Sequence, residues 1–399
     1  MPSRADTGQR YAGERVRSRR VGSQHISGVA GVTPGHDMVS SVVLLLPGDI
    51  NQRTGGYGYD REIMAGLQRL GWNVSLRVLD DSFPFPCGAA RDEAVQTLAA
   101  LPDGALVLAD GLAFGAMADE AEREAARLRL VALVHHPLAL ESGLDATTTA
   151  ALFESERRAL RTVRGVVVTS PATVRSLEPY GVPADCIAVV PPGTAPAPVA
   201  RGSRGSHPAR AGVPVELLSV AALTRRKGYD LLFHALARLT HLNWHVTAAG
   251  SPDLDPVTAQ ALAEQVLDAG LSSRVTFVGH LDEHRLGVAY DRADAFVLAT
   301  RHEGYGMAVA EAVARGIPIV STPTGAIPDL VDGGSGVIVP IDDVEALTEA
   351  LETVMNDDAR ARLAEGARRR RDTLPTWPDS VRQMAAALAA LSDHGIVQR

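Results

Sequence analysis

Apolar runs of strand length alternate with helical stretches along this chain, and that alternation constrains its fold more than any other feature. The first run, Val42–Pro47, is short and continuous, as expected of a strand covered on both faces. Strands that alternate with helices form a parallel sheet with helices on both sides. In the first half of the chain the predicted strands are Val42–Pro47, Val74–Leu79, Ala105–Asp110, Leu130–His135, Val166–Ser170 and Ile187–Val190.

The alternation breaks at residues 191–214, where Pro, Ala, Arg, Gly and Ser dominate and cannot build a core. It then resumes with a second series of predicted strands. These are Glu216–Ala221, Trp244–Ala249, Arg274–Val278, Ala295–Ala299, Ile317–Ser321 and Gly336–Pro340. The sequence therefore predicts an α/β protein with two Rossmann-like parallel-sheet domains that face an interdomain cleft.

The same pattern sets the expected domain boundaries. We expect an N-terminal domain over 38–195, a linker over 196–213 and a C-terminal domain over 214–375. Residues 376–399 contain a predicted helix, Trp377–Leu391, that is expected to pack back on the N-terminal domain. The tail 1–37 carries six arginines and few large apolar residues, so we expect it to be disordered or to precede a start at Met38.

Composition excludes several classes of function. The net charge of −8 argues against nucleic acid as a partner, because a nucleic-acid binder needs a basic footprint. The two cysteines form no C-x-x-C motif, and no apolar run reaches the length of a transmembrane helix. We therefore expect a cytoplasmic protein without a transmembrane segment, and peripheral attachment to a membrane stays open.

The most informative segment runs from Arg301 to Ala312. A predicted strand ends before it, the loop contains Gly304 and Gly306, and a helix is expected to begin near Met307. The N-terminus of a helix offers unpaired N–H groups and a partial positive charge to anions. Two carboxylates accompany it, Glu303 in the loop and Glu311 about one turn into the helix, and carboxylates suit bonds to sugar hydroxyls. Taken alone, each could instead only favour the helix dipole.

A second segment, Ser219–Gly228, places Arg225, Arg226 and Lys227 directly after a predicted strand. Parallel sheets bind ligands at the carboxyl ends of their strands. Three adjacent cations there can clamp a pyrophosphate, since Lys acts as a point charge and Arg can bond two oxygens at once. A solvated surface cluster is the alternative interpretation.

These residues carry a resemblance to a known family. The pattern E-G-Y-G-x-x-x-x-E at Glu303–Glu311 resembles the E-x7-E motif of the family 4 glycosyltransferases, which are retaining enzymes of the GT-B fold. The resemblance extends from about Glu216 to Leu351. It implies that Glu303 holds donor-sugar hydroxyls and contributes to catalysis, and that Glu311 holds the nucleotide ribose. The expected donor-binding loop also comprises Gly304, Tyr305, Gly306, Met307 and Ala308, with backbone amides of the last three meeting the sugar and phosphates.

The resemblance extends to other loops of the chain. It implies that Lys227 meets the diphosphate and that Arg225 or Arg226 replaces an arginine that the family commonly carries near Ala222. The turn Gly279-His280-Leu281 would meet the nucleobase through backbone atoms, which does not separate UDP from GDP. The pair Gly55-Gly56 resembles a flexible loop that closes over the donor phosphates.

Two histidines end a predicted strand beside the expected cleft. A histidine occurs near the reacting sugar in the family, so His135 and His136 are both candidate catalytic residues, with His135 slightly favoured. Successive side chains of a strand point to opposite faces, so we expect only one of them to face the cleft. A hydrogen-bonded structural histidine is the alternative.

The sequence Asp253-Leu254-Asp255 matches a D-x-D metal-binding pattern but precedes Pro256 and a predicted helix. Aspartate before a proline at the first helical position is ordinary chemistry for the start of a helix. We therefore expect neither a metal site nor a cofactor.

These features predict a retaining, metal-independent hexosyltransferase that moves a sugar from a UDP- or GDP-sugar to an acceptor hydroxyl. The sequence does not identify the acceptor. A nucleotide-sugar epimerase or a glycan phosphorylase of the same plan, and a non-catalytic nucleotide- or glycan-binding protein, remain alternatives. An NAD-dependent dehydrogenase is disfavoured because the G-x-G-x-x-G signature is missing.

Overall fold

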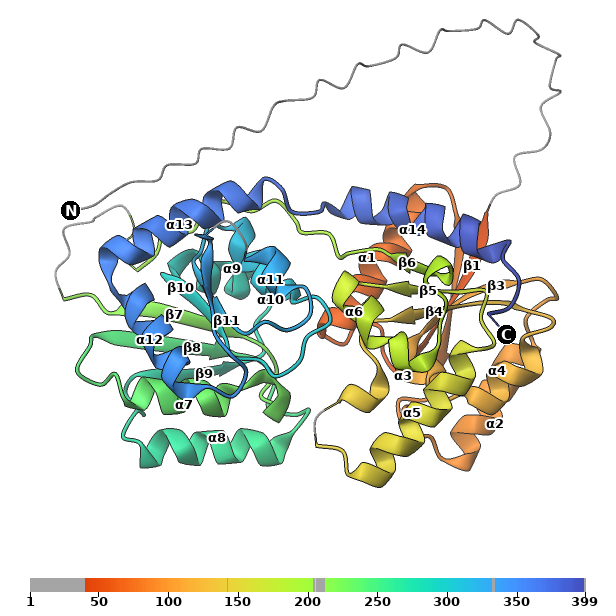
Figure 1. The fold of residues 1–399 in the computed structure, drawn as a ribbon, viewed down its shortest axis with the longest axis horizontal. Coiled ribbons are helices and arrows are strands. Elements are labelled where there is room, and N and C mark those ends of the chain that lie inside the picture. Colours follow the sequence, from red (N-terminus) through yellow and green to blue (C-terminus); the bar gives the residue numbers. More distant parts are fainter. Residues whose placement is uncertain (1–39, 142, 204, 206–211, 332–333, 398–399) are drawn as a thin grey trace, which may run out of the picture. The chain divides into compact units, whose positions relative to one another are not determined.

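The computed structural model describes residues 40–397, apart from 142, 204, 206–211 and 332–333 (Figure 1). The predicted disordered tail, 1–37, lies outside the described residues. In the part that is described, no helix is both long enough and apolar enough to cross a membrane.

The N-terminal sheet contains six parallel strands in the order β2-β1-β3-β4-β5-β6. The strands are β1 (Ser41–Pro47), β2 (Asn73–Leu79), β3 (Leu106–Asp110), β4 (Arg129–Val134), β5 (Gly165–Val168) and β6 (Ile187–Val189). The accompanying helices are α1 (Gly55–Arg69), α2 (Gly88–Ala99), α3 (Gly111–Phe114), α4 (Ala118–Glu124), α5 (Ala146–Leu160) and α6 (Pro171–Ser176).

The C-terminal sheet repeats this plan in the order β12-β11-β10-β7-β8-β9, again with parallel strands. Its strands are β7 (Val215–Val220), β8 (Trp244–Ala249), β9 (Val275–Gly279), β10 (Ala295–Leu298), β11 (Ile319–Ser321) and β12 (Gly336–Ile338). The later helices are α7 (Tyr229–Ala237), α8 (Pro256–Asp268), α9 (Glu283–Arg292), α10 (Met307–Ala314), α11 (Ile327–Leu330), α12 (Val344–Met355), α13 (Asp357–Arg371) and α14 (Trp377–Ser392).

Each of the twelve predicted strands is present, with boundaries that differ by two residues at most, and the predicted fold class is confirmed. Strand order reverses between β1 and β3 in the first sheet and between β7 and β10 in the second. Such reversals open a crevice at the carboxyl ends of the strands, where parallel α/β sheets bind ligands. The loops that follow β1, β3, β7 and β10 are therefore the places to look for a site.

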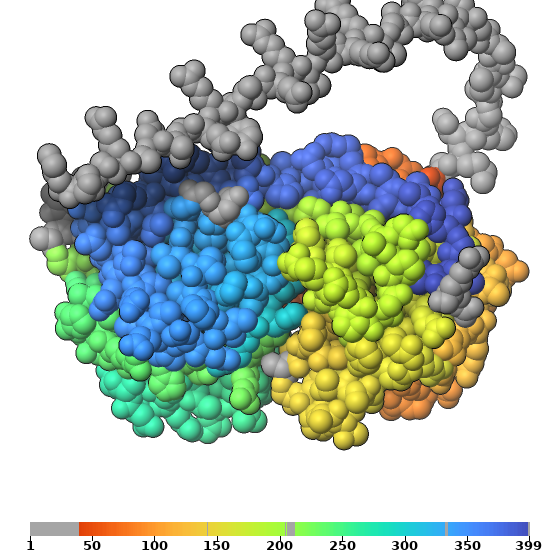
Figure 2. Space-filling model, in the orientation of Figure 1, coloured from red at the N-terminus to blue at the C-terminus, as the bar shows by residue number. Residues whose placement is uncertain are grey.

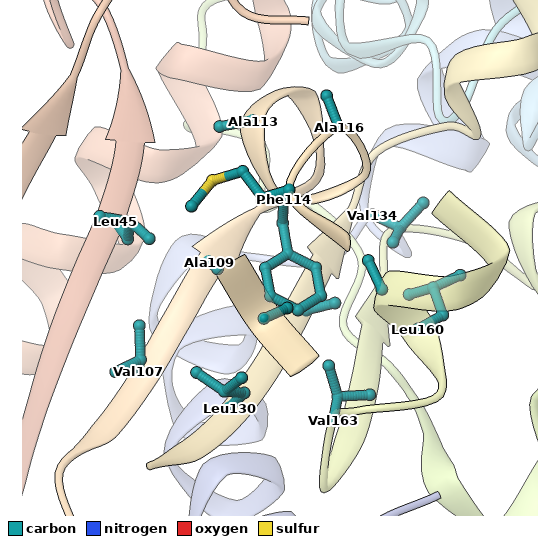
Figure 3. Packing of buried hydrophobic residues seen from close by; sticks show 14 of the residues in the cluster. Leu45, Val107, Ala109, Ala113, Phe114, Ala116, Leu130, Val134, Leu160 and Val163 are labelled. Atoms are coloured by element: carbon teal, nitrogen blue, oxygen red, sulfur yellow. The ribbon is translucent and has the colours of Figure 1, made fainter. Parts of the chain in front are cut away.

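Phe114 illustrates how the core fixes one of these loops. Its ring is 2% exposed and packs among Leu45, Ala109 and Leu130 on one face of the N-terminal sheet (Figure 3). The α3 turn that carries Phe114 begins at Asp110, whose side chain accepts a hydrogen bond from the backbone N–H of Leu112. Burial of the ring thus holds the end of β3 in place.

Helices α13 and α14 follow one another along the top of the ribbon in Figure 1, and the C-terminal part of the chain forms the dark blue band along the top of Figure 2. Helix α13 packs on α10 and β12, whereas α14 packs on α1, β4 and β5 of the N-terminal sheet. The segment around Pro191–Thr194 lies beside the segment around Pro375–Ser380. Thr194 N–H donates to Pro375 O at 2.7 Å, and the Ser380 hydroxyl donates to Pro191 O at 2.7 Å. The α14 helix therefore completes the core beneath α1.

Gly66 on α1 permits this contact with α14. A Cβ atom there would lie 2.2 Å from a methyl carbon of Val381, which is itself 4% exposed. We expect Gly66→Ala to lower the free energy of unfolding by about 1–3 kcal/mol, because added volume in a packed core forces neighbours apart. Denaturant unfolding measures the change.

Two variants control this experiment. Gly287→Ala in α9 adds a methyl group where nothing lies within 4 Å, so it should leave stability unchanged or raise it by up to about 1 kcal/mol. Val381→Ala combined with Gly66→Ala should recover part of the loss. A Gly66→Ala protein as stable as the parent would contradict this account of the α1–α14 contact.

Candidate functional site

The loops that follow β7 and β10 meet at the reversal point of the C-terminal sheet. The backbone N–H of Arg301 donates to Arg226 O at 2.8 Å, and the Thr300 hydroxyl donates to the same oxygen at 3.1 Å. In return, the Arg226 guanidinium donates to His302 O at 3.0 Å. Two segments about 75 residues apart in sequence thus form one continuous structure.

Lys227 and Glu303 form an ion pair at the centre of this structure. Their side chains are 16% and 11% exposed. Burial lowers the pKa of Lys227 from its ordinary value, although the Glu303 carboxylate acts in the opposite direction. Burial would raise the pKa of Glu303, but the charges of Lys227 and Arg226 outweigh it and hold that pKa below its ordinary value. Lys227 is also the only lysine in the sequence.

The loop between β10 and α10 is held by close backbone approaches. A Cβ at Gly304 would lie 2.2 Å from His135 O of the N-terminal half, and the Ser170 hydroxyl donates to Gly304 O at 2.8 Å. Gly325 approaches Glu303 O just as closely, so a Cβ there would lie 2.3 Å away. Because no side chain fits at Gly304, glycine is required where the two halves meet.

Helix α10 begins at Gly306, whose φ of 95° lies in the left-handed region that favours glycine. No side chain caps this helix start, so the first backbone N–H groups of α10 keep their capacity to donate. The first turn of α1 lies opposite: Cβ atoms at Gly55 and Gly58 would each be 3.8 Å from the Met307 side chain. Two helix N-termini, one from each half, therefore lie close together here.

His135 lies between these elements. Its Nε2 atom is 3.4 Å from a carboxylate oxygen of Asp60 on α1 and 3.4 Å from one of Asp110 at the end of β3. A Cβ at Gly56 would lie 3.3 Å from the ring, and Tyr59 makes an edge-to-face contact with it at 5.4 Å. His135 is thus built into a buried charged cluster at the start of α1.

His136 contacts a different set of residues. Its Nε2 is 3.2 Å from Glu141, which also accepts a hydrogen bond of 3.1 Å from Arg226, and its ring lies 5.4 Å from that of His302. The two histidines therefore turn to different partners. Glu141 joins the β4 loop of one half to the β7 loop of the other.

The expected base-binding turn is joined to the N-terminal half by Arg53. The Arg53 guanidinium lies 2.5 Å from Nε2 of His280 and 3.4 Å from Leu281 O. Gly279 has a φ of 63°, which turns the chain at the end of β9. Arg53 belongs to the loop between β1 and α1, so this loop reaches across to the turn after β9.

Two residues of the E-x7-E segment lie deeper than the loop itself. Glu311 accepts a hydrogen bond of 3.0 Å from the Tyr290 hydroxyl, and burial raises the pKa of this carboxyl. The Tyr305 side chain is 8% exposed and packs in the core with Val309 and Ile327. The structure thus brings together Glu303, Gly304, Gly306, Met307 and Lys227, while the Tyr305 ring packs in the core.

The Asp253-Leu254-Asp255 sequence starts a helix, as expected. Asp255 is the N-cap of α8 and accepts a hydrogen bond of 3.0 Å from the backbone N–H of Thr258, with Pro256 in the first turn. Asp253 accepts instead from the Ser251 hydroxyl at 2.9 Å. Both carboxylates are therefore engaged in local structure.

A pocket of about 390 Å³ lies beside Glu303 and takes residues from both halves of the chain. His136 and Arg175 contribute from the N-terminal half, and Arg301, His302 and Thr324 contribute from the C-terminal half. Arg301 is engaged with Asp230 and Asp342. Among the described residues, Arg175 makes no ion pair and is the lining cation that stays available.

Sequence reasoning did not single out Asp60, Asp110, Arg53 or Glu141. Each is an ordinary helix, turn or loop residue by its local pattern, and its role follows from contacts 25 to 228 residues away. Only the position of Asp110 could have been used to predict a site residue. A carboxylate directly at the end of a buried strand lies at the ligand-binding edge of a parallel sheet.

Two models of known families match this chain. The family model described as Glycosyl transferases group 1 matches residues 208–370, which contain β7 to β12 and the Lys227–Glu303 pair. The model described as Glycosyltransferase Family 4 matches residues 105–197, which contain β3 to β6 and His135. The chain belongs to the group 1 glycosyltransferases of family 4.

Curated relatives of this glycosyltransferase match it over part of their length. A lipopolysaccharide core biosynthesis mannosyltransferase of Rhizobium meliloti is 37% identical over 146 residues, which are 35% of this chain and 40% of the relative. A D-inositol 3-phosphate glycosyltransferase of Xylanimonas cellulosilytica is 32% identical over 200 residues, 47% of this chain and 48% of the relative. The chain thus spans less than half the length of either relative.

Solved structures share the fold of this glycosyltransferase over most of both chains. Sucrose-phosphate synthase from Thermosynechococcus elongatus has a TM-score of 0.72 at 22% identity and covers 88% of this chain and 99% of its own. Anabaena HepE in complex with UDP and glucose has a TM-score of 0.68 at 18% identity, with 87% and 99% coverage. At these identities the likeness shows the GT-B fold alone.

The Lys227–Glu303 pair of this glycosyltransferase allows a stability test. Lys227→Met and Glu303→Gln should each lower the free energy of unfolding, by up to about 3–5 kcal/mol, because each leaves a largely buried charge without its partner. The double variant should lose less than the sum of the two. Denaturant unfolding of all four proteins measures this coupling.

The pH dependence of stability gives a second readout of the same pair. Because the pKa of Glu303 is lowered in the folded state, its contribution is present above the ordinary glutamate pKa and is lost as the pH falls through the folded value. Glu303→Gln should therefore weaken the acid dependence of unfolding. Additive losses together with an unchanged pH dependence would contradict a coupled pair.

Proposed function

We propose that this chain transfers a hexose-type sugar from a nucleoside diphosphate sugar to an acceptor hydroxyl, with retention at the anomeric carbon and without a metal ion. One observation carries the proposal: Lys227, Glu303 and the uncapped start of α10 converge at the reversal point of one parallel sheet. A cation and uncapped backbone amides can bind a diphosphate, and a carboxylate can accept hydrogen bonds from the hydroxyls of a sugar.

The diphosphate is assigned to the crevice between the two helix N-termini. Lys227 supplies a cation, and the first amides of α10 supply oriented donors that cost no reorganisation during the reaction. Of the two arginines, Arg226 is favoured over Arg225, because the charge of Arg226 acts on both Lys227 and Glu303. Gly55 and Gly56 at the start of α1 let backbone approach the same group.

The remaining parts of the donor are assigned by the family resemblance and by position. Glu303 would accept hydrogen bonds from the sugar, Glu311 would hold the ribose, and the base would lie along Gly279-His280-Leu281. Arg53 contacts this turn, so it would border the base as well. The complex of Anabaena HepE with UDP and glucose supports a nucleotide donor, with UDP or GDP to be decided by experiment.

The reaction then follows from these assignments. The bond between the anomeric carbon and the diphosphate oxygen breaks, and Lys227 and the α10 amides stabilise the charge that develops on the diphosphate. The acceptor oxygen forms its new bond on the face that the leaving group vacates, and its proton passes to the leaving diphosphate oxygen. This route gives retention and requires no pair of catalytic carboxylates of the glycosidase type.

A donor panel tests this proposal. With UDP-glucose, GDP-mannose and ADP-glucose supplied in turn, one donor should be consumed at a rate that EDTA does not change. Lys227→Met should lower kcat/KM by at least about 100-fold, because it removes a charge aimed at the leaving group. NMR of the product reports the anomeric configuration.

The control for the donor panel is Arg285→Ala, which removes an exposed cation of α9 whose side chain is 73% exposed. It should leave the rate unchanged. Inversion at the anomeric carbon, or dependence on a divalent ion, would contradict the proposed mechanism. Interconversion of the nucleotide sugar without transfer would favour an epimerase, and donor binding without turnover would favour a binding protein.

We further propose that the acceptor occupies the 390 Å³ pocket beside Glu303 and carries a phosphate or another anion. Arg175 is the pocket cation that is not engaged in an ion pair among the described residues, and it lies across the pocket from the C-terminal half. The names of two similar proteins, the D-inositol 3-phosphate glycosyltransferase and sucrose-phosphate synthase, support a phosphorylated molecule as substrate or product.

Arg175→Ala should raise the KM for a phosphorylated acceptor at least tenfold and leave the KM for the donor unchanged, since Arg175 lines the pocket from the N-terminal half and has no part in the proposed donor site. Steady-state kinetics with hexose 6-phosphates and the matching free hexoses measures this difference. Preference for the unphosphorylated acceptors, or an equal change in both KM values, would contradict the assignment.

A further inference from the structure

We infer that Asp60 and Asp110 are positioning residues that hold the His135 ring as an imidazolium, so that His135 acts as a fixed cation and hydrogen-bond donor and not as a base. The positioning itself stands on the geometry of the cluster. The catalytic part of the inference rests on the proposed function.

The two carboxylates converge on one nitrogen of the ring. His135 Nε2 lies 3.4 Å from Asp60 Oδ1 and 3.4 Å from Asp110 Oδ2. Asp60 is 1% exposed and Asp110 is 4% exposed. In the part of the chain that is described, neither the oxygens of Asp60 nor Nε2 of His135 have a hydrogen-bond partner, so the 3.4 Å contact between Asp60 and the ring is one of charge. A buried carboxylate such as that of Asp60 keeps its charge more readily with a cation beside it.

Asp60, Asp110 and His135 are each held in place by a different element of the fold. Asp60 lies on the second turn of α1, whose start is capped by Thr54. Asp110 ends β3 and uses Oδ1 to accept the backbone N–H of Leu112, which directs Oδ2 toward His135. His135 directly follows β4, next to β3 in the sheet. The cluster is therefore fixed by the ends of two neighbouring strands and one helix.

Other charged and titratable groups nearby do not replace the imidazolium. The Arg61 guanidinium is engaged with the carbonyl oxygens of Ile50 and Gln52 at 2.5 and 2.9 Å. The hydroxyl of Tyr59 donates to Val190 O at 3.0 Å and that of Tyr57 donates to Pro47 O at 2.6 Å. Burial raises the pKa of both tyrosines, so both remain neutral.

The protonation balance agrees with this geometry. Burial would lower the pKa of His135, but its contacts with Asp110 and Asp60 outweigh burial and raise that pKa to about 10. Burial raises the pKa of Asp60 to about 6, against the lowering effect of His135. The imidazolium charge is thus present below about pH 10 and is lost as the pH rises through that value.

The ring has one further donor to offer. No hydrogen bond joins Nδ1 of His135 to another described residue, and the side chain is 21% exposed beside Gly56 and Gly304. At neutral pH this nitrogen can donate to a sugar hydroxyl or a phosphate oxygen but cannot accept the acceptor's proton. His135 therefore adds positive charge to the crevice while the proton goes to the leaving group.

A histidine titration followed by NMR on the wild-type protein tests the positioning without using activity. With ¹⁵N-labelled histidine, and with His135→Asn to assign the signal, the His135 resonances should stay those of an imidazolium from pH 6 to 8.5. In Asp60→Asn and Asp110→Asn they should titrate within this range. His135 signals that titrate near pH 6.5 in the wild type would overturn the inference.

The pH dependence of kcat tests the catalytic part. The wild type should show no falling limb from His135 between pH 6 and 8.5. In Asp60→Asn and Asp110→Asn, kcat should fall about tenfold for each pH unit above the new pKa and recover toward pH 6, because activity follows the imidazolium. Loss that is equal at every pH would indicate a merely structural role.

Two controls complete the experiment. Asp119→Asn removes an exposed carboxylate of α4, paired with Arg158, and should leave the NMR titration and the pH profile unchanged. The three ligand-type atoms of the cluster lie within 4.8 Å of one another, a spacing that would also suit a divalent cation. Stoichiometric Zn²⁺ binding by the wild type and not by Asp60→Asn would replace the imidazolium with a metal and overturn the inference.

Discussion

The ion pair between Lys227 and Glu303 is the interaction on which the rest of the site depends. It joins the loop after β7 to the loop after β10 at the point where the strand order reverses, and both side chains are largely buried. A charge in this position is stable only with its partner, so each loop fixes the other. A backbone hydrogen bond from Arg301 N–H to Arg226 O links the same two loops. The Lys227–Glu303 pair thus helps to position the start of α10.

The second constraint is the distance between the two halves of the chain. Gly304 comes so near His135 O that a Cβ would overlap it, and Ser170 donates to the Gly304 carbonyl from the same side. This approach brings the His135 cluster, built from α1, β3 and β4, against the loop that carries Glu303. The N-terminal half therefore places the His135 cluster beside the Glu303 loop of the C-terminal half.

Sequence patterns predicted local secondary structure well, but they predicted poorly which residues far apart in the sequence contact one another. All twelve strands, the start of α8 at Asp255 and the loop around Gly304 could be found because each leaves a periodic or turn signal within a few residues. Asp60 and Arg53 leave none, since their partners lie 75 and more than 200 residues away. Tyr305 shows the converse limit: its motif indicated a ligand, whereas its ring fills the core beside α10. A motif fixes the backbone, and the surrounding packing decides where each side chain turns.

The solitary lysine has a practical consequence for chemistry on this protein. Lys227 is the only lysine in the sequence, and every other permanently charged basic side chain is an arginine, so Lys227 is the one side-chain amine that the sequence offers to amine-selective reagents. Arginine and lysine are not interchangeable in such reactions, because the guanidinium stays protonated and unreactive. An acylating or reductive-alkylating probe would thus report on the surroundings of the Lys227–Glu303 pair. Lys227 therefore offers a single side-chain site for labelling at the place where a ligand is expected.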